Sequence, residues 1–425
     1  MSKKEERTYR SYIIHKAEKC DELDELNLLA GRIYSKTVSL IKKTHEKKGI
    51  WLKKLDLGKY IRCYDYPCTM SSHYAVIDDY YGALSSYFER RKRDKTSRPP
   101  FRTSKYHSFG WGHGTIKVEG DCLRLRMGGK RDPILLKVAP KFQKVPRLIR
   151  LVYNKNTNCY EFHAMYEVKD NELQNPSGRT VSVDQGEIHP IVSFDGKTTT
   201  IYNGRYLRSV RQYRNKFLKR INKKLSHCKR HSRRWTKLKA AKSRVLEKIK
   251  NQIKDIEHKI TSRFVSACHK LKVQTIVLGD LTHIRQSIHY GKRANQRLHQ
   301  WSFGKIAALI TYKAKNVGIE IKTISERYTS QTCPRCNNRK KPTGRDYTCP
   351  KCDYKGHRDA IGASNIWTKF QNALFNPVGF TTAAPIGIRF TAELKRLDGW
   401  SSLLGLKCRI FHDEKNSKGD KNVNR

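Results

Sequence analysis

Residues 179–204 have the sequence RTVSVDQGEIHPIVSFDGKTTTIYNG, and they carry the clearest fold signal in the chain. Three short segments in this stretch are rich in β-branched residues: RTVSVDQG, HPIVSFDG and TTTIYNG. Each one contains Gly, Asp or Asn near its end, and these residues are typical of turns. The stretch therefore predicts three consecutive strands at hairpin spacing.

The residues that follow alternate between helical and strand patterns. A long, very basic helical pair is predicted over 206–271, and VQTIVLGD (273–280) predicts a fourth strand. A helix over 301–316, a fifth strand over 319–325 and a final helix beginning near Asp359 complete the series. The order βββαβαβα is that of the RNase-H fold, so we expect an α/β domain of this type.

The N-terminal part has a different pattern. Residues 8–16 predict a strand, and the ranges 22–48 and 71–93 predict helices. From 101 to 168 the chain consists of short alternating segments separated by Gly, Asp-Pro and Asn-rich turns, which indicates a β-barrel or sandwich. We expect the first strand to join this sheet, which makes the two helices an insertion into a barrel.

Charge is the dominant feature of the composition. Lys and Arg total 89 against 38 acidic residues among 425, a formal net charge of +51. Between Arg208 and Arg263 there are twenty-one basic residues and three acids. Such a surplus repels itself in a compact monomer and favours a polyanionic partner. A membrane surface or a basic tail is the rival interpretation, but basic residues interleaved with aromatics along the whole chain favour nucleic acid.

Several segment types are not expected. The start, residues 1–7, is not followed by an apolar stretch, so we predict no signal peptide, and no run of eighteen apolar residues predicts a membrane helix. The twelve cysteines are then expected to be metal ligands and free thiols, without disulfides. We predict a cytoplasmic protein.

Four of the cysteines have the spacing of a zinc ribbon. They form a C-x₂-C, x₁₂, C-x₂-C array, in which each short turn directs two thiolates at one ion: Cys333, Cys336, Cys349 and Cys352. Four thiolates complete the coordination shell, so we predict a zinc ion that orders a loop and performs no hydrolysis.

Other polar residues near cysteines allow two interpretations. Basic residues around the array indicate a nucleic-acid contact or a solvated loop: Lys340, Lys341, Arg345 and Lys351. Cys63, Cys68 and His73 have irregular spacing, and we interpret them as ordinary residues and not as a second metal site.

Three acids are candidates for phosphodiester chemistry, which requires several carboxylates converging on Mg²⁺ from different strands. Asp184 lies within an apolar strand, where an unpaired acid costs several kcal/mol. Asp359 begins the last helix and is alternatively an N-cap. Glu326 ends the fifth strand and is alternatively a surface acid.

At these residues the chain resembles a known family. The strings ERYTSQTCPRC (326–336) and YTCPKCDYKGHRDAIGASNIW (347–367) are similar to the C-terminal signature of TnpB proteins, their Fanzor relatives and compact type V CRISPR effectors. SVDQGEIHP (182–190) resembles the first RuvC motif of that family, and TIVLGDLTHIR (275–285) resembles the second. The likeness covers about 179–369.

The resemblance implies a domain plan. The N-terminal part comprises the first strand of a β-barrel or wedge domain (1–18), a helical recognition insertion (19–98) and the rest of the barrel (99–170). A linker (171–178) leads to a RuvC-like nuclease domain (179–330 and 355–370), into which a zinc ribbon that binds target nucleic acid is inserted (331–354). A partly disordered tail (371–425) follows.

Carried over by residue, Asp184 matches the first catalytic aspartate of the family and Asp359 the third. The second position departs, because Gly279 stands where most members have glutamate, before Asp280. One interpretation is relocation to Glu326: adjacent strand residues face opposite sides, so Asp280 cannot replace a side chain at 279, whereas glycine leaves space for a longer side chain from a neighbouring strand. A second interpretation is that the site is inactive as a nuclease. A third is that Asp280 is the metal ligand.

The implied function is an RNA-guided DNA endonuclease. A guide RNA would pair with one strand of double-stranded target DNA beside a short motif, and Asp184, Glu326 and Asp359 would hold Mg²⁺ for cleavage. The basic helices would line the heteroduplex channel. We expect a transposon-associated nuclease working as a monomer with RNA; a compact CRISPR effector, a transposase and a guided repressor are the alternatives.

Overall fold

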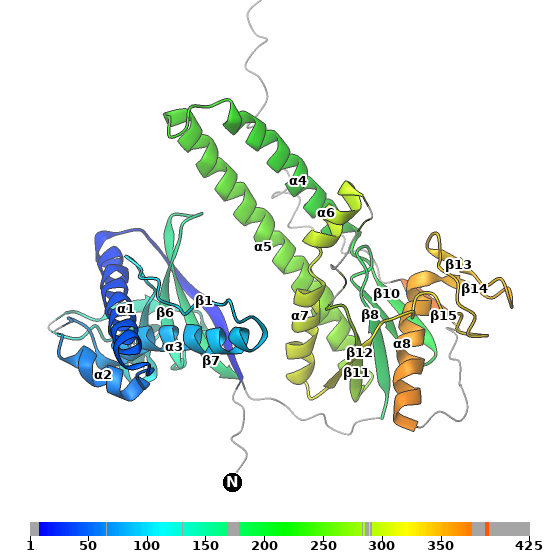
Figure 1. The fold of residues 1–425 in the computed structure, drawn as a ribbon, viewed down its shortest axis with the longest axis horizontal. Coiled ribbons are helices and arrows are strands. Elements are labelled where there is room, and N and C mark those ends of the chain that lie inside the picture. Colours follow the sequence, from blue (N-terminus) through cyan, green and yellow to red (C-terminus); the bar gives the residue numbers. More distant parts are fainter. Residues whose placement is uncertain are drawn as a thin grey trace, which may run out of the picture. The chain divides into compact units, whose positions relative to one another are not determined.

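The computed structural model describes residues 8–64, 66–129, 131–168, 178–282, 284, 289, 291–375 and 387–390. The chain divides into two compact units (Figure 1). The first comprises Met1–Asp170 and Leu225–Glu247, and the second comprises Asn171–Lys224 and Lys248–Arg425. Each unit is α/β in composition.

The first unit contains two antiparallel sheets. A four-stranded sheet has the order β1-β7-β6-β2, and a three-stranded sheet has the order β3-β4-β5. The strands are β1 (Thr8–Glu18), β2 (Phe109–Gly112), β3 (Ile116–Glu119), β4 (Cys122–Leu125), β5 (Ile134–Lys137), β6 (Leu148–Asn154) and β7 (Cys159–Val168). The first strand pairs with β7 along its length, so it joins this sheet as predicted. The closure of the two sheets into a barrel stays a prediction.

Three helices lie between β1 and β2 in the chain. They are α1 (Asp21–Lys48), α2 (Lys54–Arg62) and α3 (Met70–Arg93). They share one core with the strands, in which Trp111 and Tyr80 are fully buried. Asn27 on α1 is also buried, and its Oδ1 accepts a hydrogen bond from the backbone N–H of Phe109 at 3.1 Å. Because an unmet buried amide is costly, this bond fixes the helical insertion on the sheet.

The second unit is built on one mixed sheet with the order β12-β11-β8-β9-β10-β15. Its strands are β8 (Thr180–Asp184), β9 (Ile191–Phe194), β10 (Thr198–Tyr202), β11 (Thr275–Asp280), β12 (Glu320–Ser325) and β15 (Gly387–Phe390). β8, β11 and β12 run parallel, while β9 is antiparallel to β8 and β10. The carboxyl ends of the three parallel strands therefore meet at one edge of the sheet.

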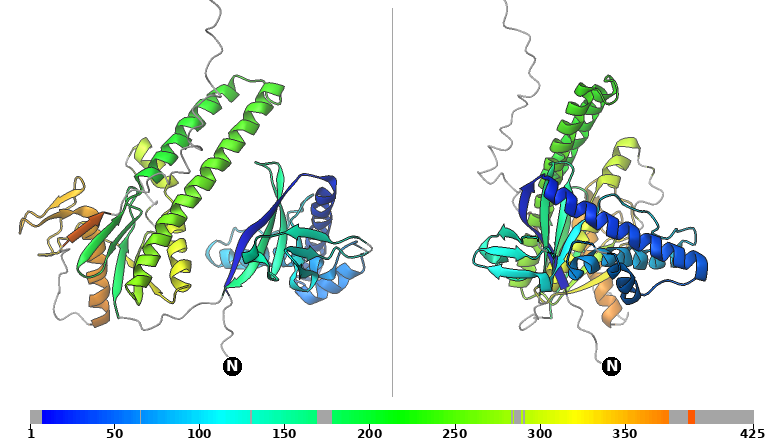
Figure 2. Two further views of the ribbon diagram at one scale, coloured as in Figure 1. Left: turned by 180° about the vertical axis from the view of Figure 1, so that it is seen from behind. Right: turned by 90° about the vertical axis from the view of Figure 1, so that its left-hand side faces the viewer.

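Helices cover both faces of this sheet (Figures 1 and 2). α8 (Arg358–Phe375) packs on one face, where Ile366 and Phe370 contact Val277. The C-terminal part of α5 (Arg233–Lys270) and α7 (Phe303–Lys315) lie on the other, where the rings of Phe264 and Tyr202 are 5.7 Å apart. Burying one large apolar side chain contributes about 1.5–3 kcal/mol, so these two layers hold the edge of the sheet rigidly.

A buried carboxylate joins the helices of this unit. Glu257 on α5 is completely buried and is paired with Arg211 of α4 (Arg205–Ser226) at 3.1 Å. Lys305 of α7 contacts its other oxygen at 2.5 Å. Breaking a buried pair of this kind typically costs about 3–5 kcal/mol, so Glu257 fixes where the basic helices leave the sheet.

The structure differs from the sequence predictions at short elements. β2, α2, α6 (Lys292–Gln300) and β15 were not predicted, because they are too short to show a periodic pattern. Within the predicted tail (371–425), β15 pairs in parallel with β10, and α8 extends to Phe375. Residues 171–177 of the predicted linker (171–178) and most of the predicted tail lie outside the described residues. No helix in the described ranges combines the length and the apolar character that a membrane span requires.

Candidate active site and metal centre

The end of β8 and a glycine of β11 lie side by side. Leu278 is paired with Val183, so the following residues, Gly279 and Asp184, are at the same level of the sheet. A Cβ atom added to Gly279 would lie 1.8 Å from Oε1 of Glu326 and 2.2 Å from its Cγ. The side chain of Glu326 therefore fills the space that any larger residue at 279 would occupy, as the relocation interpretation requires.

Glu326 reaches this position from the strand on the far side of β11. It directly follows β12, whose Ile324 pairs with Gly279. Its Oε1 is buried and has no hydrogen-bond donor among the described residues. Burial, together with the charges of Asp184 and Asp280, raises the pKa of Glu326 to about 9. The protein environment therefore disfavours a negative charge on Glu326 and would favour a cation beside it.

Asp184 has a similar environment. Burial and the charge of Asp359 raise its pKa to about 7, and the charge of Arg358 opposes this rise. α8 passes close to the carboxylate, because a Cβ on Gly362 would lie only 2.7 Å from Oδ2 of Asp184. A glycine on the helix and a glycine on β11 thus both make room for acidic side chains.

Asp359 is in the first turn of α8 and is buried. Its Oδ2 lies 2.8 Å from His189 Nδ1 and accepts a hydrogen bond from Arg345 Nη1 at 2.8 Å. Arg358 Nε is 3.4 Å from Oδ1. Burial alone would raise the pKa of Asp359, but the bond with His189 and the charges of Arg345 and Arg358 outweigh it and hold the pKa well below its usual range. These contacts therefore favour the ionised form of Asp359.

Asp280 is placed differently. Its side chain is exposed, and its Oδ1 accepts a hydrogen bond from the backbone N–H of Thr282 at 2.9 Å. The hydroxyl of Thr282 contacts the same oxygen. Adjacent residues of a strand point to opposite sides, which explains why Glu326 and not Asp280 occupies the space beside Asp184.

The acids fit a hard divalent cation. Two partly buried carboxylates with raised pKa values, one of them with an oxygen lacking a donor, form a site that a cation would stabilise. The third carboxylate, Asp359, is ionised but directs its oxygen at His189 and Arg345. In the described residues, Asp359 forms a group with His189 and His357, whose ligand atoms all lie within 4.8 Å of one another. Asp184 and Glu326 are not part of that group.

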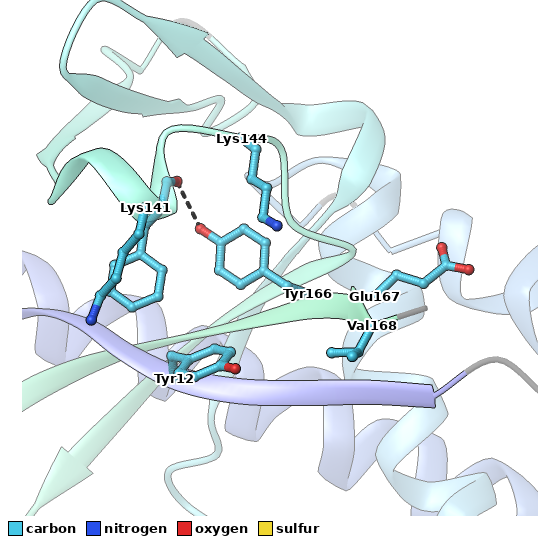
Figure 3. Close-up of a pocket in the computed structure, with 7 residues that line it drawn as sticks. Tyr12, Lys141, Lys144, Tyr166, Glu167 and Val168 are labelled. Atoms are coloured by element: carbon cyan, nitrogen blue, oxygen red, sulfur yellow. Dashed lines mark hydrogen bonds between the residues drawn. The ribbon is translucent and has the colours of Figure 1, made fainter. Parts of the chain in front are cut away.

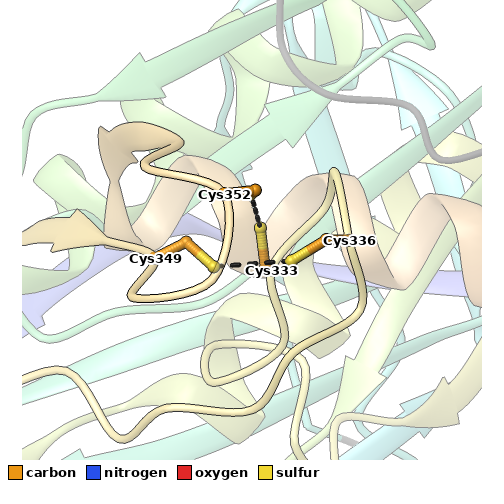
Figure 4. A group of neighbouring side chains, drawn as sticks. All are labelled: Cys333, Cys336, Cys349 and Cys352. Carbon is orange, nitrogen blue, oxygen red and sulfur yellow. Dashed lines mark hydrogen bonds between the residues drawn. The ribbon is translucent and has the colours of Figure 1, made fainter.

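The four cysteines form a second, separate centre. Cys333 and Cys352 have their sulfurs 3.6 Å apart, and those of Cys336 and Cys349 are 3.4 Å apart (Figure 4). A tetrahedral zinc ion with bonds of about 2.3 Å places its sulfurs about 3.8 Å apart, so the array fits zinc. Backbone N–H groups of Arg335 and Lys351 donate to these sulfurs, each at 3.4 Å.

The ribbon is connected to the acidic cluster. β13 (Asp346–Thr348) pairs with β14 (Lys355–His357), which leads directly into α8. Arg345, immediately before β13, accepts a backbone hydrogen bond from Arg358 at 2.7 Å and carries the guanidinium that contacts Asp359. The folding of the cysteine loops therefore helps to position Asp359.

Sequence reasoning missed the histidines of this site. His189 is buried, and His357, with its pKa lowered mainly by burial, accepts a hydrogen bond from the backbone N–H of Asp359 at 3.3 Å. The ligand atoms of these three residues lie within 4.8 Å of one another. The available signal was a histidine next to a proline just before a buried strand. Cys63, Cys68 and His73 form no such group in the described residues.

The fold and these centres define a class: an α/β multidomain protein with buried carboxylates at the edge of a mixed sheet and a ribbon of four cysteines beside them. Residues 163–285 match the OrfB_IS605 family model, described as a probable transposase. Residues 303–366 match the Cas12f1-like TNB domain. The two matches make this chain similar to TnpB-like transposases over 163–285 and to the Cas12f1-like TNB domain over 303–366.

Individual proteins show the same two similarities. The chain is 29% identical over 198 residues to TnpB-like protein MJ0751 of Methanocaldococcus jannaschii, covering 45% of this chain and 69% of that protein. It is 31% identical over 123 residues to the CRISPR-associated endodeoxyribonuclease Cas12f1 of Sulfoacidibacillus thermotolerans, covering 28% of each. The structure resembles Cas12f1 in a complex with sgRNA and target DNA with a TM-score of 0.55, 16% identity, and coverage of 82% and 83%; this likeness concerns the fold.

Proposed function

We propose that this protein is an RNA-guided DNA endonuclease whose RuvC-like site has its second acid at Glu326. The observation that carries the proposal is the side chain of Glu326 in the space over Gly279, beside Asp184. An inactive site would have no need to keep a buried acid there, because a buried carboxylate without a partner costs free energy.

Asp184, Glu326 and Asp359 would hold Mg²⁺ in this site. When bound, the metal lowers the pKa of a water molecule and stabilises the charge that develops on the phosphate. The protein residues orient the acids: Gly279 and Gly362 give the carboxylates room, and His189 and Arg345 keep Asp359 ionised. Neutral ligands would not hold a hard cation equally well.

Charge and similarity support nucleic acid as the partner. A net charge of +51 suits a protein that holds RNA and DNA by their backbones. The similar Cas12f1 structure is a complex with sgRNA and target DNA, and we extend this partnership to the present chain. The match to a probable transposase model favours a transposon-associated enzyme, which we expect to act as a monomer with its RNA.

The first experiment asks whether the chain carries RNA and cuts with it. The chain is expressed with its native downstream flank, the copurifying RNA is sequenced, and that RNA programmes cleavage of a matching duplex with Mg²⁺. Wild type is compared with Glu326→Gln and with Asp280→Asn as the matched control. We expect Glu326→Gln to abolish cleavage with DNA binding retained, and Asp280→Asn to keep cleavage.

The other outcomes separate the alternatives. Loss of cleavage in Asp280→Asn alone would move the second acid to residue 280 and leave the nuclease proposal intact. RNA-dependent DNA binding by wild type without any cleavage would make the chain a guided binder. Absence of any copurifying RNA would contradict the guided function itself.

A further inference from the structure

The first unit contains a cavity that the nuclease chemistry does not use. It has a volume of about 340 Å³ and lies over β1, β7 and the short helix η2 (Pro140–Phe142) (Figure 3). Ligand pockets in proteins generally have about 300–1,000 Å³, so the cavity is large enough for one small group. Three aromatic rings and two lysines line it: Tyr12, Phe142, Tyr166, Lys141 and Lys144.

The rings form a fixed aromatic surface. The centroid of Tyr12 is 5.4 Å from Phe142 and 6.2 Å from Tyr166, and Phe142 stacks on Tyr166 at 5.8 Å with 20° between planes. The hydroxyl of Tyr166 donates to the backbone carbonyl of Phe142 at 2.9 Å, which ties the strand to the η2 loop (Figure 3). Tyr166 is only 4% exposed, whereas Tyr12 is 37% exposed and is accessible to solvent.

The charges around the rings favour an anionic ligand. Lys141 Nζ lies 4.9 Å from the ring centroid of Phe142, and Lys144 Nζ lies 5.4 Å from that of Tyr166. Both lysines are exposed at the rim. A cationic ligand, such as a methylated amine, would be repelled by two ammonium groups, although an aromatic cage alone would suit it. Glu167, also at the cavity, can accept a hydrogen bond from a neutral N–H group.

An aromatic surface beside positive charges matches a nucleotide. A base presents a π-face to aromatic side chains, while its phosphate pairs with lysine. We propose that this cavity binds one unpaired nucleobase of RNA, stacked on Tyr12 with its phosphate at Lys141 and Lys144. RNA is the better source than target DNA, because proteins read RNA at splayed-out bases of loops and bulges, whereas bases of a DNA duplex are paired. The inference rests on the proposed function for the presence of a bound RNA.

A defined RNA probe tests this site without cleavage. The full chain is titrated at one fixed salt concentration with a hairpin RNA that carries a single bulged 2-aminopurine, and with the same hairpin lacking the bulge. Fixed salt matters, because a chain this basic binds all RNA through phosphates. We expect the bulged hairpin to bind more tightly and its fluorescence to fall as the base stacks.

Variants assign the effect to the cavity. Tyr12→Ala should remove the preference for the bulge, a change of about 5- to 150-fold, which is the range for loss of one base–aromatic stack. Tyr12→Phe should retain it. Tyr60→Ala removes a tyrosine that is 57% exposed on α2 and should change nothing. Lys144→Gln should weaken the bulged complex and reduce its salt dependence.

Three results would overturn the inference. They are an equal affinity for bulged and unbulged RNA, an equal loss for both RNAs in Tyr12→Ala, and an equal preference for a bulge in the matching DNA hairpin. The last result would show that the cavity does not distinguish an RNA base from a DNA base. These failures are distinct from failure of the proposed function, because a chain that cuts with its copurified RNA but ignores the bulge loses only this inference.

Discussion

The two candidate metal centres of this protein differ in how far apart their residues are in the chain. The paired sulfurs of the ribbon come from residues 13 and 19 positions apart. Asp359 and its partner His189 are 170 positions apart, and Glu326 reaches its place across β11. Local spacing therefore suffices to recognise the ribbon, whereas the acidic site exists only when the sheet has its correct strand order.

The centres also differ in how the protein stabilises charge. The ribbon presents backbone N–H groups to its sulfurs, a local arrangement that accompanies each tight turn. The acidic site places Asp184 and Glu326 where burial raises both pKa values. We expect the ribbon to depend on zinc for its fold, and the acidic site to fold without Mg²⁺ at a cost in stability.

The largest effect is expected from removing a carboxylate of the acidic site. Asp184→Asn should reduce RNA-guided DNA cleavage about 10³-fold or more, because groups that act as a unit fail together. Asp195→Asn is the control, since Asp195 is an exposed turn acid of the same sheet that bonds only to backbone N–H groups in the described structure. Single-turnover cleavage measures both. Equal rates for the two variants would exclude Asp184 from the site.

Removing a cysteine of the ribbon should reduce activity by unfolding the ribbon. Cys333→Ser should lower the bound zinc and expose the ribbon to protease, because zinc binding supplies folding free energy of about 10–16 kcal/mol in isolated zinc modules. Cleavage should fall too, since Arg345 would no longer support Asp359. Elemental analysis and limited proteolysis measure these changes. Cys63→Ser, at an exposed cysteine, should leave one zinc per chain; a loss there would reveal a second site.

Gly279→Ala tests the packing that distinguishes the acidic centre. The new Cβ would overlap Oε1 of Glu326, so we expect about a 10²-fold loss of cleavage, the effect of a misplacement of roughly 1 Å. Gly82→Ala is the control, because nothing lies within 4 Å of a Cβ there. The double variant Gly279→Glu with Glu326→Gly should recover part of the activity. Full activity in Gly279→Ala would contradict the placement of Glu326.

His189→Ala should have a smaller effect. His189 bonds Asp359 at 2.8 Å, and loss of a residue that orients a metal ligand typically costs about 10- to 100-fold in metal affinity or activity. Calorimetric titration with Mg²⁺ gives a readout that is independent of cleavage. His269→Ala, at an exposed residue of α5, should bind Mg²⁺ like wild type. If His189→Ala binds Mg²⁺ with the affinity of wild type, His189 contributes only to packing and does not position the metal ligand.

The smallest effect is a difference in thermal stability. Unfolded glutamate has a pKa of about 4.3, whereas burial raises the pKa of Glu326 to about 9 in the folded protein. Between these values the folded state binds more protons, so the free energy of unfolding falls as pH rises. Glu326→Gln cannot ionise and should unfold roughly 2–5 °C above wild type at pH 8.5 without added Mg²⁺, and at the same temperature at pH 5. Parallel pH profiles for the two proteins would contradict this.

The sequence alone predicted the long elements of the protein. The strands at 179–204, the basic helices and the two long helices of the first unit, α1 and α3, have strong periodic patterns, and the structure contains them. β2, α2, α6 and β15 were missed, because three or four residues of strand or two turns of helix are stabilised by neighbours and not by their own pattern.

For the site, sequence spacing determined the cysteine array, since all ligands and turns lie within one loop pair. The sequence also named Asp184, Glu326 and Asp359, but it left Glu326 and Asp280 as rivals. Only the tertiary structure decided which of these two side chains fills the space over Gly279, because this depends on the parallel register of β11 and β12. Asp359 likewise contacts His189, which is 170 positions away, and Arg345, which lies before the ribbon strands. A local sequence pattern does not predict these contacts.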